Sequence, residues 1–189
     1  YKRQVVYGAT EHLASNVLSR FGVKIVEVDM KDLDAVKAAC EANPQAKGVF
    51  FETPMNPTME LADIQGISDI AHGVNPDMHV IVDNTFATPY LQRPLELGAD
   101  TVVHSTTKYI GGHGLVVGGL LTTTSEQVKS AAYTVIKDIG STPSPFDTWL
   151  VNNGLKTLPA RMEQHCKNAM AVARFLEEHP AVDLSLIHI

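Results

Sequence analysis

The chain has 189 residues, of which 44% are hydrophobic, and this is enough to bury a sizeable core in a globular domain. A formal net charge of −6 and a pI near 5.7 argue against a nucleic-acid partner, since no cluster of lysines or arginines offsets them. The apolar runs are too short to span a membrane. Cys40 and Cys166 are isolated, which indicates neither a disulfide framework nor a zinc site. We therefore expect a cytoplasmic protein whose partners include neither nucleic acid nor a membrane.

Apolar residues at helical or strand spacing predict elements that alternate along the chain. Helices are expected over 11–20, 32–42, 61–72, 125–137 and 160–178, and strands over 23–28, 48–51, 79–82, 101–104 and 116–122. Strands separated by helices require crossover connections, so this order predicts an α/β domain with a largely parallel sheet. The Pro-rich stretch 141–145 is the best candidate for a domain boundary, and a long helix is expected after it.

Lys108 lies in a run that combines hydroxyls, an amine and glycines: His104-Ser105-Thr106-Thr107-Lys108-Tyr109-Ile110-Gly111-Gly112-His113-Gly114. Hydroxyls and backbone N–H groups beside a lysine suit a phosphate group that stays on its carrier, and a lysine amine can bond an aldehyde. A P-loop is excluded because this lysine precedes the glycines, and Val117 breaks the dinucleotide fingerprint. Taken alone, a lysine is more often a solvated surface residue.

Asp83 directly follows the apolar run Val80-Ile81-Val82, which is typical of a buried strand. Ligands of open α/β sheets collect outside the carboxyl ends of the strands, so Asp83 and Ser105 are expected at the same edge. A carboxylate there can keep the pyridine nitrogen of a cofactor protonated. The alternative is a turn or capping role, which the neighbouring Asn84 favours.

Together, these motifs resemble the Cys/Met-metabolism family of pyridoxal-5′-phosphate (PLP) enzymes. The resemblance rests on the string VIVDNTFATPYLQRPLELGADTVVHSTTKYIGGHG and on the blocks YGAT, FETPMNPT, SPFD and GLKTL, and it extends to about Val182. It implies the PLP-dependent transferase fold type I (aspartate-aminotransferase-like), with a mostly parallel sheet between helices, and a homotetramer of catalytic dimers. By this resemblance, Lys108 is the Schiff-base lysine and Asp83 the pyridinium partner, while Ser105 and Thr107 contact the phosphate.

Two further residues receive roles from the same resemblance. Tyr7 matches the tyrosine that stacks on the cofactor ring and relays protons to the leaving group, and Asn56 matches the asparagine near the PLP 3′-oxygen. Core packing is the alternative for Tyr7, and a turn before Pro57 is the alternative for Asn56. The histidines show no metal-ligand spacing, so they are interpreted as structural.

The implied activity is α,γ-elimination on a sulfur amino acid, cystathionine or methionine, which gives a thiol, a 2-oxo acid and ammonia. The same residues would also serve γ-replacement on an O-acyl-homoserine, as in a cystathionine γ-synthase or homoserine-ester sulfhydrylase. Ala9 stands where many methionine γ-lyases have cysteine, which makes a dedicated methionine γ-lyase less favoured. A non-catalytic PLP-binding protein is the third alternative.

The resemblance also divides the chain. Residues 1–156 are expected to form the large PLP-binding domain without its N-terminal segment, and 157–183 a linking helix and the start of a truncated C-terminal domain. The substrate-carboxylate arginine is expected beyond the chain. Residues 184–189 match the translation of a transposon-derived sequencing adapter, so we expect an artefactual tail, the alternative being a genuine β-strand.

Overall fold

The computed structural model describes residues 7–182, so the expected artefactual tail at 184–189 lies outside the described residues. The chain forms two compact units. Unit 1 comprises Tyr1–Asn84, Pro94–Val102 and Thr122–Ser125, and unit 2 comprises Thr85–Arg93, Val103–Leu121 and Glu126–Ile189. We describe each unit by itself.

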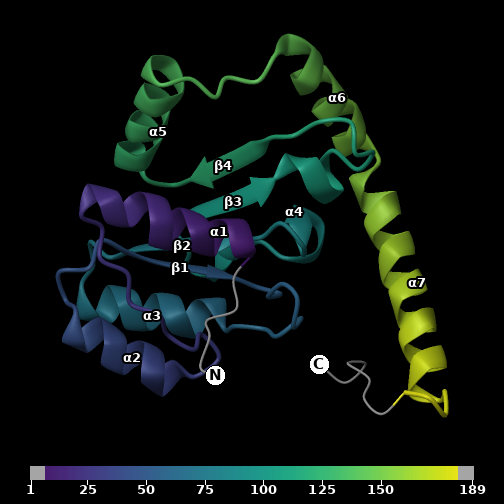
Figure 1. The fold of residues 1–189 in the computed structure, drawn as a ribbon, viewed down its shortest axis with the longest axis horizontal. Helices are drawn as coiled ribbons and strands as arrows, with labels where there is room; N and C mark the ends of the chain where they lie inside the picture. The colour runs from purple at the N-terminus through teal and green to yellow at the C-terminus, as the bar shows by residue number, and fades with distance from the viewer. Residues whose placement is uncertain (1–6, 183–189) are drawn as a thin grey trace. The chain divides into compact units, whose positions relative to one another are not determined.

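Helices and strands alternate along the chain, as the sequence predicts (Figure 1). The strands are β1 (Gly48–Glu52), β2 (His79–Asp83), β3 (Thr101–Ser105) and β4 (Gly119–Thr123). The α-helices are α1 (Gly8–His12), α2 (Leu33–Ala42), α3 (Ile64–Val74), α4 (Thr88–Leu91), α5 (Glu126–Asp138), α6 (Pro145–Lys156) and α7 (Leu158–Glu177). Short π or 3₁₀ segments are η1 (Leu13–Val17), η2 (Leu18–Phe21), η3 (Pro94–Leu97) and η4 (Thr106–Ile110).

The four strands form one sheet in the order β1-β2-β3-β4. β1 and β2 are parallel, with Gly48 opposite His79 and Glu52 opposite Asp83. β4 runs antiparallel to β3: the Thr106 N–H donates to the Gly118 carbonyl (2.9 Å) at one end, and the Thr124 N–H donates to the Asp100 carbonyl (3.1 Å) at the other. The predicted α/β class with a mostly parallel sheet is confirmed.

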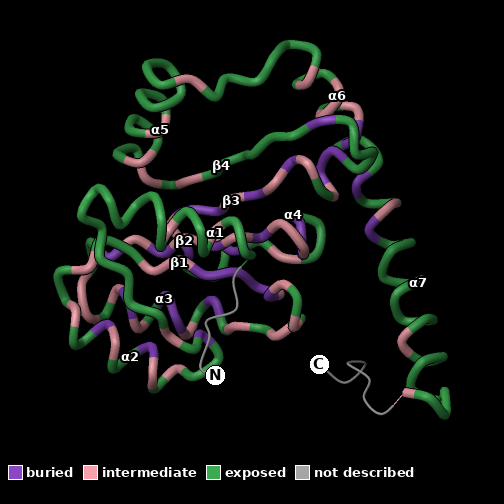
Figure 2. Tube along the Cα trace, in the orientation of Figure 1, coloured by how far each residue is buried: buried purple, intermediate pink, exposed green. Residues whose placement is uncertain are grey.

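The core of unit 1 is built from α2, α3, β1 and β2, whose buried residues stand out in Figure 2. Alternate residues of β2 are buried, and so are residues of α2 and α3 at helical spacing. The fully buried side chains of this core include Phe51, Ile67, Val80 and Val82. These apolar residues attach the two helices to β1 and β2.

Two aspartates define where α2 and α3 begin. The Asp32 side chain accepts hydrogen bonds from the Asp34 and Ala35 N–H groups, and the Asp63 side chain accepts one from the Gly66 N–H. These N-caps satisfy backbone donors that have no partner inside the helix. The predicted helix over 32–42 is therefore confirmed, and the one predicted over 61–72 begins three residues later.

The prediction of a strand over 23–28 is wrong. These residues form no strand, and Val23, Ile25 and Val26 are exposed. Their β-branched residues favour extended backbone, but a strand also requires a neighbour with which to form a ladder of hydrogen bonds. The strand predicted over 116–122 begins at Gly119, and α6 begins at Pro145, the last residue of the Pro-rich stretch. The domain boundary at 156/157 stays a prediction.

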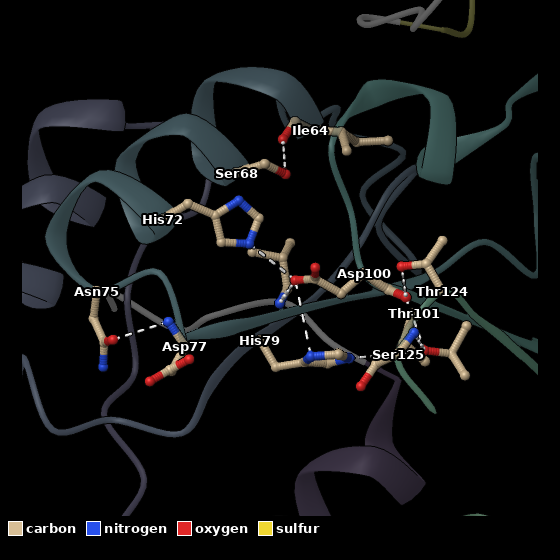
Figure 3. A network of polar contacts seen from close by, with 12 residues as sticks. Ile64, Ser68, His72, Asn75, Asp77, His79, Asp100, Thr101, Thr124 and Ser125 are labelled. Atoms are coloured by element: carbon tan, nitrogen blue, oxygen red, sulfur yellow. Dashed lines mark hydrogen bonds and ion pairs between the residues drawn. The ribbon is translucent and has the colours of Figure 1, made fainter. Parts of the chain in front are cut away.

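In unit 1, a network of polar side chains joins the ends of the sheet strands where β2 and β3 begin (Figure 3). Asp100 Oδ2 accepts hydrogen bonds from His72 Nε2 (2.9 Å) and from the Val80 N–H (2.7 Å). His79 Nε2 lies 2.6 Å from the Thr101 hydroxyl, which donates to Thr123, whose hydroxyl donates to the Asp100 carbonyl. Because the Thr101 hydroxyl proton is donated to Thr123, the Thr101 oxygen can only accept from His79, so His79 Nε2 is the donor.

Candidate functional site

In unit 1, two acidic residues end neighbouring parallel strands. Glu52 is the last residue of β1 and Asp83 the last residue of β2, and they are partners in the register. The Thr53 N–H donates to the Asp83 carbonyl (3.4 Å), which continues the pairing one step past β1. Asp83 is half-buried at this position, and Asn84 after it is fully buried. Two carboxylates thus lie at the carboxyl ends of neighbouring strands, where ligands of open α/β sheets bind.

Glu52 contacts the segments that carry two other predicted residues. Its Oε1 accepts a hydrogen bond from the Asn56 N–H (2.7 Å), and its Oε2 accepts one from the Tyr7 N–H (3.0 Å). Only 7% of Glu52 is exposed. Burial raises the pKa of the Glu52 carboxyl, as does the nearby charge of Asp83, while the two N–H donors oppose this shift.

Tyr7 and Asn56 each lie where a backbone segment changes direction. The Tyr7 carbonyl accepts hydrogen bonds from the Thr10 and Glu11 N–H groups at the start of α1, and the residue is 48% exposed. Core packing therefore does not describe Tyr7 in this structure. Asn56 opens a turn before Pro57 and is half-buried. Glu52 lies in the block FETPMNPT, but it is not among the residues predicted from the sequence to form the site. Its place after three apolar residues, like that of Asp83, was the available signal.

In unit 2, hydroxyl groups surround the end of β3. The Ser105 N–H donates to the Thr85 hydroxyl (2.8 Å), and the Thr107 hydroxyl accepts a hydrogen bond from the Gly118 N–H (3.0 Å). Thr107 also lies 3.4 Å from the Gly118 carbonyl. A Cβ on Gly118 would lie 2.8 Å from the Thr106 hydroxyl, so only glycine allows this close approach. Hydrogen bonds with Thr85 and Gly118 thus hold Ser105 and Thr107, the residues just before Lys108.

Lys108 interrupts the helical segment η4. Its backbone angles, φ −92° and ψ −128°, are not helical, whereas the segment extends from Thr106 to Ile110. The Lys108 carbonyl accepts a hydrogen bond from the Gly112 N–H (2.8 Å), and the residue is exposed. The kink therefore presents an accessible amine directly after the hydroxyl-bearing residues.

Arg161, from α7, fastens the turn that follows Lys108. Its guanidinium donates to the carbonyls of Tyr109 (2.7 Å) and Gly154 (2.8 Å), and its Nε donates to the Thr157 hydroxyl (2.9 Å). Gly112 has a φ of +75°, and a Cβ there would lie 2.5 Å from the guanidinium carbon. The positive φ favours glycine at 112, and a larger residue there would also displace the Arg161 guanidinium. Composition and spacing alone gave no indication of the role of Arg161.

A mostly apolar cavity of about 450 Å³ lies elsewhere in unit 1. Its lining includes Leu13, Val26, Cys40 and Phe50 and none of the six predicted site residues. Within residues 7–182, no group of three or more His, Cys, Asp or Glu side chains is arranged to hold a metal ion. The same described part of the chain contains no helix that combines the length and apolarity needed to cross a membrane. Of the predicted site residues, Asp83 and Ser105 lie at strand ends and not in this cavity.

Comparison with known proteins bears directly on these strand ends. Residues 2–186 match the family described as Cys/Met metabolism PLP-dependent enzyme. The chain belongs to this family. The match includes both acidic strand ends of unit 1 and the whole Lys108 segment of unit 2. The resemblance inferred from the sequence motifs is confirmed.

Members of the family with different names are similar to the chain. It is 50% identical over 181 residues to an L-methionine gamma-lyase of Treponema denticola, covering 95% of this chain and 45% of that protein. It is 48% identical over 176 residues to a cystathionine gamma-synthase of Mycobacterium bovis, covering 93% of this chain and 44% of that protein. The crystal structure of metB from Corynebacterium glutamicum matches with a TM-score of 0.91 and 43% identity, covering 96% and 46%. The chain thus spans about 45% of the length of such relatives.

Proposed function

We propose that the full-length protein is a PLP-dependent trans-sulfuration enzyme that performs α,γ-elimination on cystathionine or methionine. The products would be a thiol, a 2-oxo acid and ammonia. The observation that carries the proposal is the kinked segment around Lys108, in which an exposed amine follows hydroxyl-bearing residues at the end of β3. Family membership and the relative named L-methionine gamma-lyase support it.

The chemistry of these side chains fits PLP. Ser105 and Thr107 supply hydroxyls, which suit a phosphate. Lys108 supplies a primary amine for the aldehyde. Asp83 supplies a carboxylate, which favours the protonated form of the pyridine nitrogen. When bound, PLP supplies an electron sink for the negative charge that develops at the substrate Cα.

Residues of the protein would carry out the proton transfers and orient the ring. The Lys108 amine, once displaced by the amino group of the substrate, would take the proton from Cα and then move a proton at Cβ. The Tyr7 hydroxyl would give its proton to the departing thiolate sulfur, which leaves as the thiol. Asn56 would orient the ring through its 3′-oxygen. In this proposal Lys108 and Tyr7 are the catalytic residues, while Asp83, Ser105, Thr107 and Asn56 bind the cofactor.

A second candidate is γ-replacement on an O-acyl-homoserine. It is favoured by the 48% identity to a cystathionine gamma-synthase and by the similarity to the metB structure. Both reactions use the same proton transfers as far as loss of the γ-substituent. They differ in whether water or a thiol then reacts, so the residues proposed here serve either outcome.

Product analysis of the full-length protein separates these reactions. The protein would be loaded with PLP and incubated with cystathionine, methionine, homocysteine or O-acetyl-homoserine, each with and without an added thiol. A 2-oxo acid and ammonia formed without added thiol would support elimination, whereas a thioether formed only with thiol would support replacement. A protein that binds PLP and converts none of these substrates would be a non-catalytic PLP-binding protein.

Lys108→Ala tests the central residue. This variant should lose the covalent attachment of PLP, detected as a pyridoxyl label after borohydride reduction and peptide mapping, and turnover should fall at least 10³-fold, on the order expected for loss of an essential nucleophile and base. Lys137→Ala, an exposed lysine on α5, is the matched control and should retain both. A retained label and turnover in Lys108→Ala would contradict the assignment.

We also propose that the full-length protein is a homotetramer in the cytoplasm. Phe146 and Trp149 of α6 stack with ring centroids 5.9 Å apart, yet they are 65% and 59% exposed. Such apolar surface is typical of regions that a further part of the protein or another subunit covers. Light scattering on the protein used for product analysis would measure its oligomeric state.

A further inference from the structure

Glu52 connects three of the residues proposed to serve PLP. Its two carboxylate oxygens accept hydrogen bonds from the N–H groups of Tyr7 and Asn56, which are 45 and 4 positions away in the sequence. Its strand position is opposite Asp83, and the two carboxylates interact electrostatically. One buried side chain therefore bonds the backbone of Tyr7 and of Asn56 and lies on the strand next to the one that presents Asp83.

The charge of Glu52 lies in an unfavourable environment unless a cation is near. Burial and the neighbouring Asp83 charge both raise the pKa of Glu52, because each destabilises its ionised form. A protonated pyridine nitrogen beside Asp83 would offset this repulsion. Binding of the protonated ring and ionisation of Glu52 are thus expected to favour each other.

We propose that Glu52 is a positioning residue for PLP: it holds the Tyr7 and Asn56 segments through their N–H groups and adds a second negative charge behind Asp83 that favours the protonated ring nitrogen. This inference rests on the proposed PLP function. Glu52 itself contacts neither substrate nor the reacting atoms in this proposal. It acts through its neighbours.

Comparing a glutamine with an aspartate substitution separates the contribution of the charge from that of the two hydrogen bonds. Glutamine has nearly the same shape, but it offers one acceptor oxygen where the carboxylate offers two, and its NH₂ group would face a backbone N–H donor. It also removes the charge. Aspartate keeps the charge but is one methylene shorter, so it cannot reach both N–H groups from the same backbone position. Glu41→Gln is the matched control, since Glu41 is exposed on α2.

The test measures dissociation constants of the full-length protein for PLP and for its 1-deaza analogue, in which CH replaces the ring nitrogen. Glu52→Gln should weaken PLP on the order of 10-fold or more, which is the usual size of a lost hydrogen bond to a charged group, and should weaken the analogue less. Glu52→Asp should keep more of the preference for PLP over the analogue. The ratio of the two constants within one variant does not depend on how much of that variant is folded.

Two results would overturn the inference while leaving the proposed function intact. Glu52→Gln could bind PLP as tightly as Glu41→Gln does, or it could lose affinity for PLP and for the analogue by the same factor, which would describe a carboxylate of the scaffold only. The proposed function fails separately, if the wild-type protein forms no covalent bond between PLP and Lys108.

Discussion

Asp100 joins three elements of unit 1 through one carboxylate oxygen (Figure 3). Oδ2 accepts from His72 at the end of α3 and from the Val80 N–H in β2, while Asp100 itself directly precedes β3. The Val80 N–H is a backbone donor at a fully buried residue. Removing the acceptor of such a buried donor destabilises the folded state, because water does not replace the lost hydrogen bond.

Asp100→Ala should therefore destabilise the His79–Asp83 strand locally. Loss of a charged acceptor costs about 1–3 kcal/mol, so amide hydrogen exchange at Val80 should accelerate on the order of 10-fold or more. Asp100→Asn should recover most of the protection, since its amide oxygen can take the place of Oδ2. Asp69→Ala, at an exposed position of α3, is the control. Equal exchange in Asp100→Ala and Asp69→Ala would show that the carboxylate contributes nothing to this strand.

At the scale of elements, features that depend on neighbouring residues were predictable, and features that depend on distant partners were not. Asp32 and Asp63 precede apolar residues at helical spacing, and the caps they form depend only on neighbouring residues. The apolar residues of 23–28 favour a strand by the same local reasoning, yet a strand requires a partner that no local pattern specifies. The kink at Lys108 also depends on contacts from other segments, with Arg161 and Gly154 holding the following turn.

Gly154 provides a test of that packing, because helix propensity and steric contact predict opposite effects there. Alanine in place of a helical glycine stabilises by about 0.5–1 kcal/mol. A Cβ on Gly154 of α6, however, would overlap the Gly111 carbonyl, and overpacking costs about 1–3 kcal/mol. Gly154→Ala should therefore lower the free energy of unfolding.

Gly73→Ala is the matched control, since Gly73 is also helical but a Cβ there would meet nothing within 4 Å. This variant should raise the free energy of unfolding, so the two substitutions are expected to differ in sign in urea unfolding of the full-length protein. If Gly154→Ala stabilises as much as Gly73→Ala does, α6 and the turn at Gly111 can separate at little cost.

At the scale of the whole molecule, the candidate site was predictable where it follows strand ends. Asp83 and Ser105 were expected at the carboxyl ends of apolar strands, and β2 and β3 do end there. The contacts of Glu52 were not predictable, because the Tyr7 N–H lies 45 residues away in the sequence and approaches it only in the fold. The roles of the six site residues stay predictions until PLP binding is measured.

The acid dependence of folding should distinguish two glutamates whose pKa shifts have opposite signs. The pKa of Glu52 is raised from its ordinary value of 4.5, chiefly by burial, so the folded state holds this proton more tightly than the unfolded state does. Its contribution to stability is present below 4.5 and is lost as the pH rises through the raised value. The pKa of Glu60 is lowered, chiefly by the hydrogen bond from Lys31, so its contribution is present above 4.5 and is lost as the pH falls through the lowered value.

Replacing each glutamate by glutamine removes its titration and leaves the other in place. In urea unfolding of the cofactor-free full-length protein, the stability of wild type relative to Glu52→Gln should fall as the pH rises above about 4.5, since only wild type must then bury an ionised carboxylate. The stability of wild type relative to Glu60→Gln should instead fall as the pH drops below that value, because protonation of Glu60 ends its ion pair with Lys31. Slopes of the same sign for the two variants would mean that the Glu52 carboxyl is not held in the buried, Asp83-facing environment on which its proposed role depends.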